Sequence, residues 1–570
     1  MRDTLFKLRM GIVVVLTVLL SYTAMKVMGI APVGVDDANI LFVYSKHLAA
    51  GEGLVYNIGG ERVEGFSSML WMLITTIGYL LTDFPYLLFL SLNVLLVGGV
   101  LGYTIQYIER HFGDSEVGGG QPFSLAGMLF LAWVIGNPSY LLWTVASLME
   151  TGLWSALLIS QTVFLLKVID YGQTNRNAIR IFSVLNAALI LTRPEGIAWV
   201  LSFTGLLLVV FRAQGMSGGQ LLKNLGTIAG ISAATLAALI MFRLWYFGYP
   251  LPNTYYVKVT PDKFYNLRFG LVYFVQFIQA SPLVVLFMAG AAAGFLRNLP
   301  AALRVLFTAN TAIEARRLAE FSLGGLILVG TLLPVLMGGD IFGAFRFYQP
   351  IWPLFILVLF YLPLPSRWWQ TTKPSVALAV SAVAIVLLTY SNTVRWPDLS
   401  EDRARIAHLF ELSERHILTG RYLHRLFDEY AGGLPTLAAS AAGGIKIGYA
   451  GDVIDTMGLN FTPMAHHDGD KKGTRGHAAF NKDVFWQYPA DLFEPTLCPR
   501  NRPPVNRYTD SDNWIYEIYR GMTADSRFVE NYTFVALSVP DTDDRVCTYM
   551  GSKWLNGLRA DGRYGIQIVD

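Results

Sequence analysis

Residues 10–30, MGIVVVLTVLLSYTAMKVMGI, are followed closely by the acidic pair Asp36-Asp37 in the segment APVGVDDANI at 31–40. A helix needs about 20 apolar residues to cross a bilayer, and this stretch has that length and character. The basic residues Arg2, Lys7 and Arg9 precede it. Because basic flanks favour the cytoplasmic side, we expect a first span with the N-terminus inside and the acidic pair just outside.

The composition of the whole chain agrees with a membrane protein. Of its 570 residues 53% are hydrophobic and only 15% are charged, and the mean hydropathy is +0.43. Soluble domains carry about 25% charged residues. The net charge of +3 gives no indication of nucleic-acid binding, and two cysteines exclude a disulfide-rich scaffold or a multi-cysteine zinc module. We therefore expect a multi-span α-helical membrane protein.

Further apolar stretches predict about eleven spans in all. They lie at 84–108, 123–143, 146–168, 179–193, 195–211, 225–247, 267–296, 321–338, 349–362 and 375–392. Counting 66–82 as one more span would put the N-terminus on the wrong side. We therefore interpret that segment as a helix lying on the outer surface.

Basic residues between the spans set the predicted orientation, since cytoplasmic loops are rich in Lys and Arg. Four inside loops are marked by Arg176 and Arg180, Arg212 and Lys223, Arg297, Arg304, Arg316 and Arg317, and Arg367 and Lys373. The turn at 192–195, the loops at 248–266 and 339–348 and everything after 393 are then external. We predict a membrane domain at 1–392, with its first external loop at 31–83. An external α/β domain follows at 393–570, with a helix at 403–425 and a strand at 534–539.

This topology gathers many charged residues on the predicted outer side. They are the carboxylates Asp36, Asp37, Glu61, Glu64, Glu150, Glu195 and Asp340 and the cations Arg193, Lys258 and Arg346. Charged groups near lipid are costly to hold, so they usually mark a functional site.

Structural explanations exist for each of these residues. The acidic pair could cap a helix at 38–50. Arg193 with Glu195, or Asp340 with Arg346, could be simple ion pairs, and the aromatic residues around Tyr255 could form an interfacial belt. Taken together on one side, however, the residues favour a site.

Sugar transfer from a lipid phosphate would use such a set. A carboxylate takes the proton of the acceptor hydroxyl, and cations hold the leaving phosphate, to which Arg is suited by its planar fork. Further carboxylates stabilise the positive charge that develops at the anomeric carbon.

Several motifs resemble one family in the same order along the chain. They are the Asp36-Asp37 pair, GERVEGFS at 60–67, LMET at 148–151, TRPEG at 192–196, FGYPLPNTYYVK at 247–258, GGD at 338–340 with FRFY at 345–348, and IDTMGL at 454–459. Together they resemble GT-C fold glycosyltransferases. More narrowly the chain is similar to the terminal arabinofuranosyltransferases of mycobacterial cell-wall synthesis and to related bacterial pilin arabinosyltransferases.

The resemblance implies roles for these residues. The donor would be a polyprenyl-phosphate sugar, decaprenyl-phosphoryl arabinofuranose in the arabinosyl branch, with Asp36 or Asp37 as the catalytic carboxylate. Candidates for holding the donor phosphate are Arg193, Lys258 and Arg346, and those for shaping the sugar pocket are Glu64, Glu150, Glu195 and Asp340. Asn253 and Tyr255 join the substrate-binding set. Met149 and the run Ile341-Phe342-Gly343 depart from the family pattern and leave the sugar open. A divalent metal is also left open.

The polar tail adds two features. Cys498 and Cys547 could pair if the tail faces an oxidising compartment. The run His466-His467-Asp468-Gly469-Asp470-Lys471-Lys472 has metal-binding residue types, but four donors crowded into five residues favour a polar loop, which could also contact an acceptor glycan. We expect the tail to orient the acceptor.

The sequence thus predicts a glycosyltransferase of a bacterial inner membrane, with an N-terminus in the cytoplasm and a periplasmic or otherwise extracytoplasmic C-terminal domain. Its partners would be the bilayer, a lipid-linked donor, and an external glycan or a pilin-type protein. One alternative is a protein O-glycosyl or lipid A sugar transferase that uses another polyprenyl sugar. A lipid-linked sugar flippase or transporter, and a glycan-binding membrane protein without activity, are alternatives of other classes.

Overall fold

The computed structural model describes most of the chain as two compact units. The described residues are 2–113, 123–172, 175–260, 262–308, 313–362, 374–393, 399–469, 471–473, 476–499, 501, 503–506, 508–509, 514–538 and 544–569. The first unit comprises Met1–Pro32, Tyr86–Leu239 and Phe264–Ile406, and the second comprises Val33–Pro85, Ile240–Lys263 and Ala407–Asp570. Arg367 and Lys373, which helped to orient the predicted spans, lie outside the described residues.

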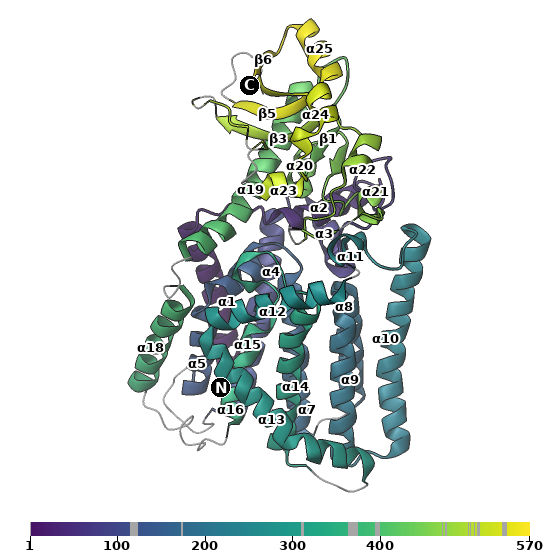
Figure 1. Cartoon of the computed structure of the whole chain (residues 1–570). Helices are drawn as coiled ribbons and strands as arrows, with labels where there is room; N and C mark the ends of the chain where they lie inside the picture. The colour runs from purple at the N-terminus through teal and green to yellow at the C-terminus, as the bar shows by residue number, and fades with distance from the viewer. Residues whose placement is uncertain are drawn as a thin grey trace. The chain divides into compact units, whose positions relative to one another are not determined.

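The first unit is helical. Figure 1 shows its long helices, and α14 packs against both α7 and α9. Its elements are α1 (Arg2–Val27), α4 (Tyr86–His111), α5 (Leu125–Ile135), α6 (Pro138–Leu141), η1 (Leu142–Ala146), α7 (Thr151–Tyr171), α8 (Arg176–Thr192), α9 (Gly196–Ala213), most of α10 (Gly218–Tyr246), α12 (Lys263–Ala280), α13 (Pro282–Phe307), α14 (Ala315–Leu336), η2 (Gly343–Phe345), η3 (Gln349–Ile351), α15 (Trp352–Phe355), α16 (Leu357–Tyr361) and α18 (Pro374–Thr393).

Within the described residues, eight helices are long and apolar enough to cross a membrane. They are Thr4–Val27, Tyr86–His111, Thr151–Tyr171, Gly196–Ala213, Gly218–Tyr246, Pro282–Phe307, Ala315–Leu336 and Gly343–Tyr361. A ninth arises if Leu125–Ile135 and Pro138–Ala146, bent by 72° against each other, count as one span. The fold is therefore compatible with a multi-span helical protein.

Two of the predicted spans are not among these helices. That at 179–193 falls in α8, which has 17 residues, and that at 375–392 falls in α18 (Pro374–Thr393), of which only the shorter stretch Leu378–Leu388 lies within the residues assessed. The predicted span at 267–296 is divided at Ser281, because Pro282 begins a new helix, α13. The 13-residue α3 (Met69–Leu81) is too short to span, as we expected for the segment at 66–82.

The second unit combines helices with a mixed six-stranded sheet. Its strands are β1 (Leu437–Ala439), β2 (Val453–Asp455), β3 (Leu492–Pro499), β4 (Tyr532–Ser538), β5 (Asp544–Gly551) and β6 (Gly565–Ile568), in the order β2-β1-β3-β5-β4-β6. β1 pairs in parallel with β2 and β3, and the remaining pairs are antiparallel. The carboxyl ends of β1 and β2 therefore meet at one edge of the sheet.

Helices from three parts of the chain belong to this unit. They are α2 (Asp36–Ala49), α3, the end of α10, α11 (Asn253–Lys258), most of α19 (Leu399–Phe427), α20 (Ala442–Gly448), α21 (Thr462–His466), α22 (Lys482–Gln487), α23 (Trp514–Ile518), η4 (Met522–Ala524), α24 (Ser526–Asn531) and α25 (Ser552–Asp561). α2 packs against α3 and α20. We assigned 31–83 to the membrane domain, whereas in the structure residues 33–85 pack in the same unit as the sheet.

Three local predictions for the tail have counterparts in the structure. α19 covers the helix predicted at 403–425, and β4 covers the predicted strand up to Ser538, while Val539 lies outside the described residues. Cys498 of β3 and Cys547 of β5 form a disulfide with their Cα atoms 5.8 Å apart. The bridge joins neighbouring antiparallel strands of the sheet.

Candidate functional site

A sharp break in the chain places Glu150 at the start of α7. The π-helix η1 ends at Ala146, and Leu148 has a left-handed backbone with φ of 57°. The TRPEG motif forms the turn between α8 and α9, where Arg193 ends one helix and Glu195 precedes the next. These two breaks bring three charged side chains together within the first unit.

Arg193 lies between two carboxylates. Its Nη1 donates to Glu150 Oε1 at 2.5 Å, while Nε and Nη2 donate to Glu195 at 3.3 and 3.0 Å. The three side chains are only 6–12% exposed. Burial acts to raise the pKa of Glu195, but the adjacent Arg193 guanidinium outweighs it, and the pKa lies below its usual value.

Arg346 makes a comparable pair. Its Nε donates to Asp340 Oδ2 at 2.7 Å and its Nη2 to Oδ1 at 3.2 Å, while Nη1 contacts the Met149 sulfur at 3.3 Å. The guanidinium also lies over the ring of Phe342, 4.3 Å from its centroid. Both predicted phosphate-binding arginines of this unit are therefore already neutralised by carboxylates.

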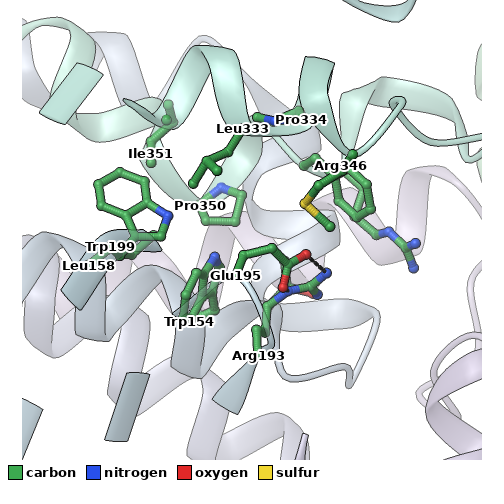
Figure 2. A pocket seen from close by; sticks show the side chains of 14 residues that line it. Trp154, Leu158, Arg193, Glu195, Trp199, Leu333, Pro334, Arg346, Pro350 and Ile351 are labelled. Atoms are coloured by element: carbon green, nitrogen blue, oxygen red, sulfur yellow. Dashed lines mark hydrogen bonds and ion pairs between the residues drawn. The ribbon is translucent and has the colours of Figure 1, made fainter. Parts of the chain in front are cut away.

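A pocket lies beside this cluster. Figure 2 shows Arg193 and Glu195 hydrogen-bonded at its edge, with side chains that line the rest of it. These include Trp154, Leu158, Trp199, Leu333, Pro334, Arg346, Pro350 and Ile351. The space open to water is about 40 Å³, enough for on the order of three waters. As it stands, the pocket is too small for a sugar ring.

Buried charges of the first unit also occur away from this cluster, at residues that were not among the predicted site residues. Asp170 is at the end of α7, twenty positions after Glu150, and accepts from Tyr107 at 2.5 Å. Glu109 pairs with Arg9 at 2.9 Å near the end of α4, and Glu320 pairs with Arg297 near the start of α14. Acidic residues of the first unit are therefore not confined to one end of its helices.

In the second unit, the acidic pair forms the first turn of α2. The N-cap position belongs to Val35, so the helix begins at Asp36 itself. The Asp36 carboxylate instead accepts from the backbone N–H groups of Gly443 at 3.0 Å and Gly444 at 2.7 Å, at the start of α20. Burial raises the pKa of Asp36 to about 7, although these two hydrogen bonds act against it.

Gly443 permits this close approach of α20 to α2. A Cβ at this position would lie 2.0 Å from the backbone oxygen of Asp36 and 2.7 Å from the nitrogen of Ile40. Only glycine fits between the two helices, and Asp36 therefore has a structural role as their link.

Asp37 is placed differently. Its Oδ2 lies 3.9 Å from Lys258 Nζ, and the two side chains are 24% and 40% exposed. Lys258 is the last residue of α11. The structure thus brings together one predicted catalytic carboxylate and one predicted phosphate-binding cation, both accessible to solvent.

Glu64 is engaged in a buried ion pair. Both of its oxygens accept from Arg243, at 2.8 Å from Nε and 2.9 Å from Nη2, and both residues are at most 5% exposed. Burial raises the pKa of Glu64 to about 7, with Arg243 acting against it. Such a pair fixes the GERVEGFS segment to the end of α10.

Asn253 connects two of the motifs. Its amide nitrogen donates to the carbonyls of Gly458 and Leu459 at 2.7 and 3.0 Å, and its oxygen lies 3.0 Å from His466 Nε2. Its own backbone N–H donates to the carbonyl of Glu64 at 2.9 Å. Asn253 therefore joins the PLPNTYY loop to the IDTMGL turn.

Asp455 organises that turn. It is fully buried and accepts from the backbone N–H groups of Met457, Gly458 and Asn460 and from the Asn460 side chain. Burial raises its pKa to about 6, while the hydrogen bonds oppose the rise. Neither Asp455, which lies within the IDTMGL motif, nor Arg243 was among the predicted site residues, although Arg243 is a lone charge in an apolar run of the sequence.

The remaining candidates have ordinary partners. Tyr255 is 45% exposed and packs edge-on against Tyr256. His467 Nε2 lies 2.7 Å from the carbonyl of Ala479. In the described part of the chain, no three His, Cys, Asp or Glu side chains gather as metal ligands would.

The comparisons with known proteins add no family assignment. No protein-family model matches the chain, and no curated protein matches it either.

Proposed function

We propose that this chain is a glycosyltransferase that moves a sugar from a polyprenyl phosphate to an external acceptor, with Asp37 as the catalytic carboxylate. The observation that carries the proposal is the difference between the surroundings of Asp36 and those of Asp37. Asp36 accepts two backbone hydrogen bonds, whereas Asp37 is partly open to solvent beside Lys258. An accessible carboxylate next to a cation suits a general base beside a phosphate.

The proposed step is a substitution at the anomeric carbon of the donor. The acceptor hydroxyl oxygen forms a bond to that carbon, and the carbon–oxygen bond to the phosphate breaks, leaving its electron pair on the phosphate. The hydroxyl proton passes to the Asp37 carboxylate. The products are the extended acceptor and the free polyprenyl phosphate.

Lys258 would compensate the charge of the leaving phosphate. It is the one candidate cation that lies beside the acidic pair in the second unit, and 40% of its side chain is exposed. We assign no phosphate to Arg193 or Arg346, because each would first have to leave its carboxylate partner.

The finer parts of the proposal rest on the motifs. They favour D-arabinofuranose as the sugar, an external glycan or a pilin-type protein as the acceptor, and a bacterial plasma membrane with the N-terminus inside. The Cys498–Cys547 disulfide supports an extracytoplasmic C-terminal region, since disulfides persist in oxidising compartments.

The test is sugar transfer by the purified protein in detergent, with decaprenyl-phosphoryl arabinose and a short arabinan. Asp37→Asn should lower transfer by about 10²- to 10⁴-fold, the range for loss of a general base. Asp36→Asn should retain most transfer at a temperature at which it is folded. Asp483→Asn, at a side chain 81% exposed in the same unit, is the matched control.

The outcomes separate the alternatives. Equal activity of wild type and Asp37→Asn would remove the carboxylate from the mechanism. Absence of transfer with this donor but activity with another polyprenyl sugar would retain the reaction class and change the sugar. Movement of the lipid-linked sugar across vesicles without any transfer would replace the enzyme by a flippase.

A further inference from the structure

Two tyrosine rings of the second unit, Tyr249 and Tyr256, stack on His466, and a third, Tyr255, packs against one of them. The His466 imidazole lies 4.2 Å from the ring centroid of Tyr249 and 4.3 Å from that of Tyr256, with interplanar angles of 30° and 37°. Tyr255 stands nearly perpendicular to Tyr256, at 5.6 Å and 89°. Tyr249 and Tyr255 remain 38% and 45% exposed. The four rings together form an aromatic platform that solvent reaches.

Hydrogen bonds with Asn253 and Lys471 hold the platform in place. The Nε2 of His466 lies 3.0 Å from Asn253 Oδ1, and the Asn253 amide is itself bound to the IDTMGL turn. Lys471 Nζ donates to the carbonyls of Tyr256 and Ala465 at 3.1 and 2.5 Å. A fixed ring arrangement loses little entropy when a ligand binds, which is a property of binding surfaces.

Charged groups of both signs adjoin the rings. Tyr255 and Lys258 are three positions apart on α11, so their side chains share one side of the helix, about 4.5 Å apart along its axis. Lys258 in turn contacts Asp37.

We propose that Tyr249, Tyr255, Tyr256 and His466 bind the acceptor, and that the acceptor is a glycan chain rather than a polypeptide. Sugar rings have an apolar face of C–H groups that stacks on aromatic rings, while their hydroxyl groups donate to carboxylates and accept from ammonium groups. The rings of the platform supply the stacking contact. Lys258 and Asp37 beside them supply the hydrogen-bonding groups. This inference rests on the proposed function, because it places the acceptor beside Asp37.

The experiment is a binding titration that requires no transfer. An arabinofuranosyl hexasaccharide is titrated into the full-length protein in lipid nanodiscs, and its Kd is measured for wild type, Tyr249→Ala and Tyr255→Ala. Each variant removes an exposed ring, and we expect Kd to rise about tenfold. Tyr488→Ala, an equally exposed tyrosine of the same unit, is the matched control and should bind like wild type.

Kinetics then separate positioning from folding. Both platform variants should raise KM for the acceptor about tenfold, with kcat and the donor KM within about twofold of wild type. Asp37→Asn keeps a side-chain oxygen that can accept from a sugar hydroxyl, so this variant should still bind the hexasaccharide while losing transfer. If wild type bound the hexasaccharide but transferred no sugar, the platform would remain a glycan-binding site and the proposed transferase activity would be rejected.

Three results would overturn the platform. The first is an unchanged Kd in both tyrosine variants, and the second is no hexasaccharide binding by wild type. The third is binding of a Ser- and Thr-rich peptide, weakened by the same variants, in place of the glycan. If both tyrosine variants transferred sugar with the wild-type acceptor KM, the proposed transferase activity would be retained and the platform would be rejected as the acceptor site.

Discussion

The arginine cluster of the first unit and the acidic pair of the second contain the same kinds of charged side chain but differ in what remains accessible. Arg193 and Arg346 each face one or two carboxylates at hydrogen-bond distance, with every side chain at most 12% exposed. Asp37 and Lys258 are 3.9 Å apart and 24–40% exposed. The first cluster is built to hold helices together, and the second retains groups that a ligand can reach.

The two regions should also respond oppositely to pH. Glu195 has a lowered pKa, so its contribution to stability is present above its unfolded pKa and is lost as the pH falls through the folded value. Asp36 has a pKa raised to about 7. Its contribution is fully present below its unfolded pKa near 4 and is lost as the pH rises to 7.

The largest expected effect on stability comes from opening the first cluster. Arg193→Ala leaves Glu150 and Glu195 buried without a cation, which should cost about 3–5 kcal/mol. The measurement is the melting temperature in detergent. Arg193→Lys keeps the charge but not the two-pronged pairing with Glu195, and it should lose less.

The structural role of the first cluster would be contradicted if Arg193→Ala had the melting temperature of wild type and lost only the binding of the lipid-phosphate donor. Arg193 would then be a ligand-binding cation, and the first cluster would be a substrate site.

A smaller effect is expected from Asp36→Asn. An amide oxygen can accept from only one of the Gly443 and Gly444 N–H groups, so the change should cost about 1–3 kcal/mol near pH 5. Because the wild type carries the cost of a charged carboxylate above pH 7, the difference in melting temperature between the two proteins should narrow by pH 8. Melting curves from pH 5 to pH 8 measure it.

A constant or widening difference with rising pH would contradict the raised pKa of Asp36. Asp483→Asn serves as the control, because its exposed carboxylate should leave the melting temperature unchanged at every pH.

Much of the helical fold could be predicted from the sequence, because long apolar runs with few charges are a clear signal for long helices. The runs at 195–211 and 321–338 became α9 and α14. The errors came from local features that hydropathy averages hide. Pro282 divides the run at 267–296 into two helices, and the run at 123–143 is bent by 72° between α5 and α6.

The candidate residues were found by type and position, but their roles depend on distant partners. Asp36 is held by Gly443 and Gly444, more than four hundred residues away. Glu64 pairs with Arg243, which looked like part of an apolar span. Neither pairing has a local signal, so sequence alone could not separate the linking aspartate from its accessible neighbour.

The smallest effect on stability should come from Lys258→Met, which tests whether the second region is open. Ion pairs between exposed groups contribute about 0.2–1 kcal/mol, so the melting temperature should hardly change. Transfer should fall by about tenfold or more, because the leaving phosphate loses its nearby positive charge. A loss of several kcal/mol with normal transfer by the folded fraction would mean that Lys258 and Asp37 are a structural pair, no different in kind from Arg193 and its carboxylates.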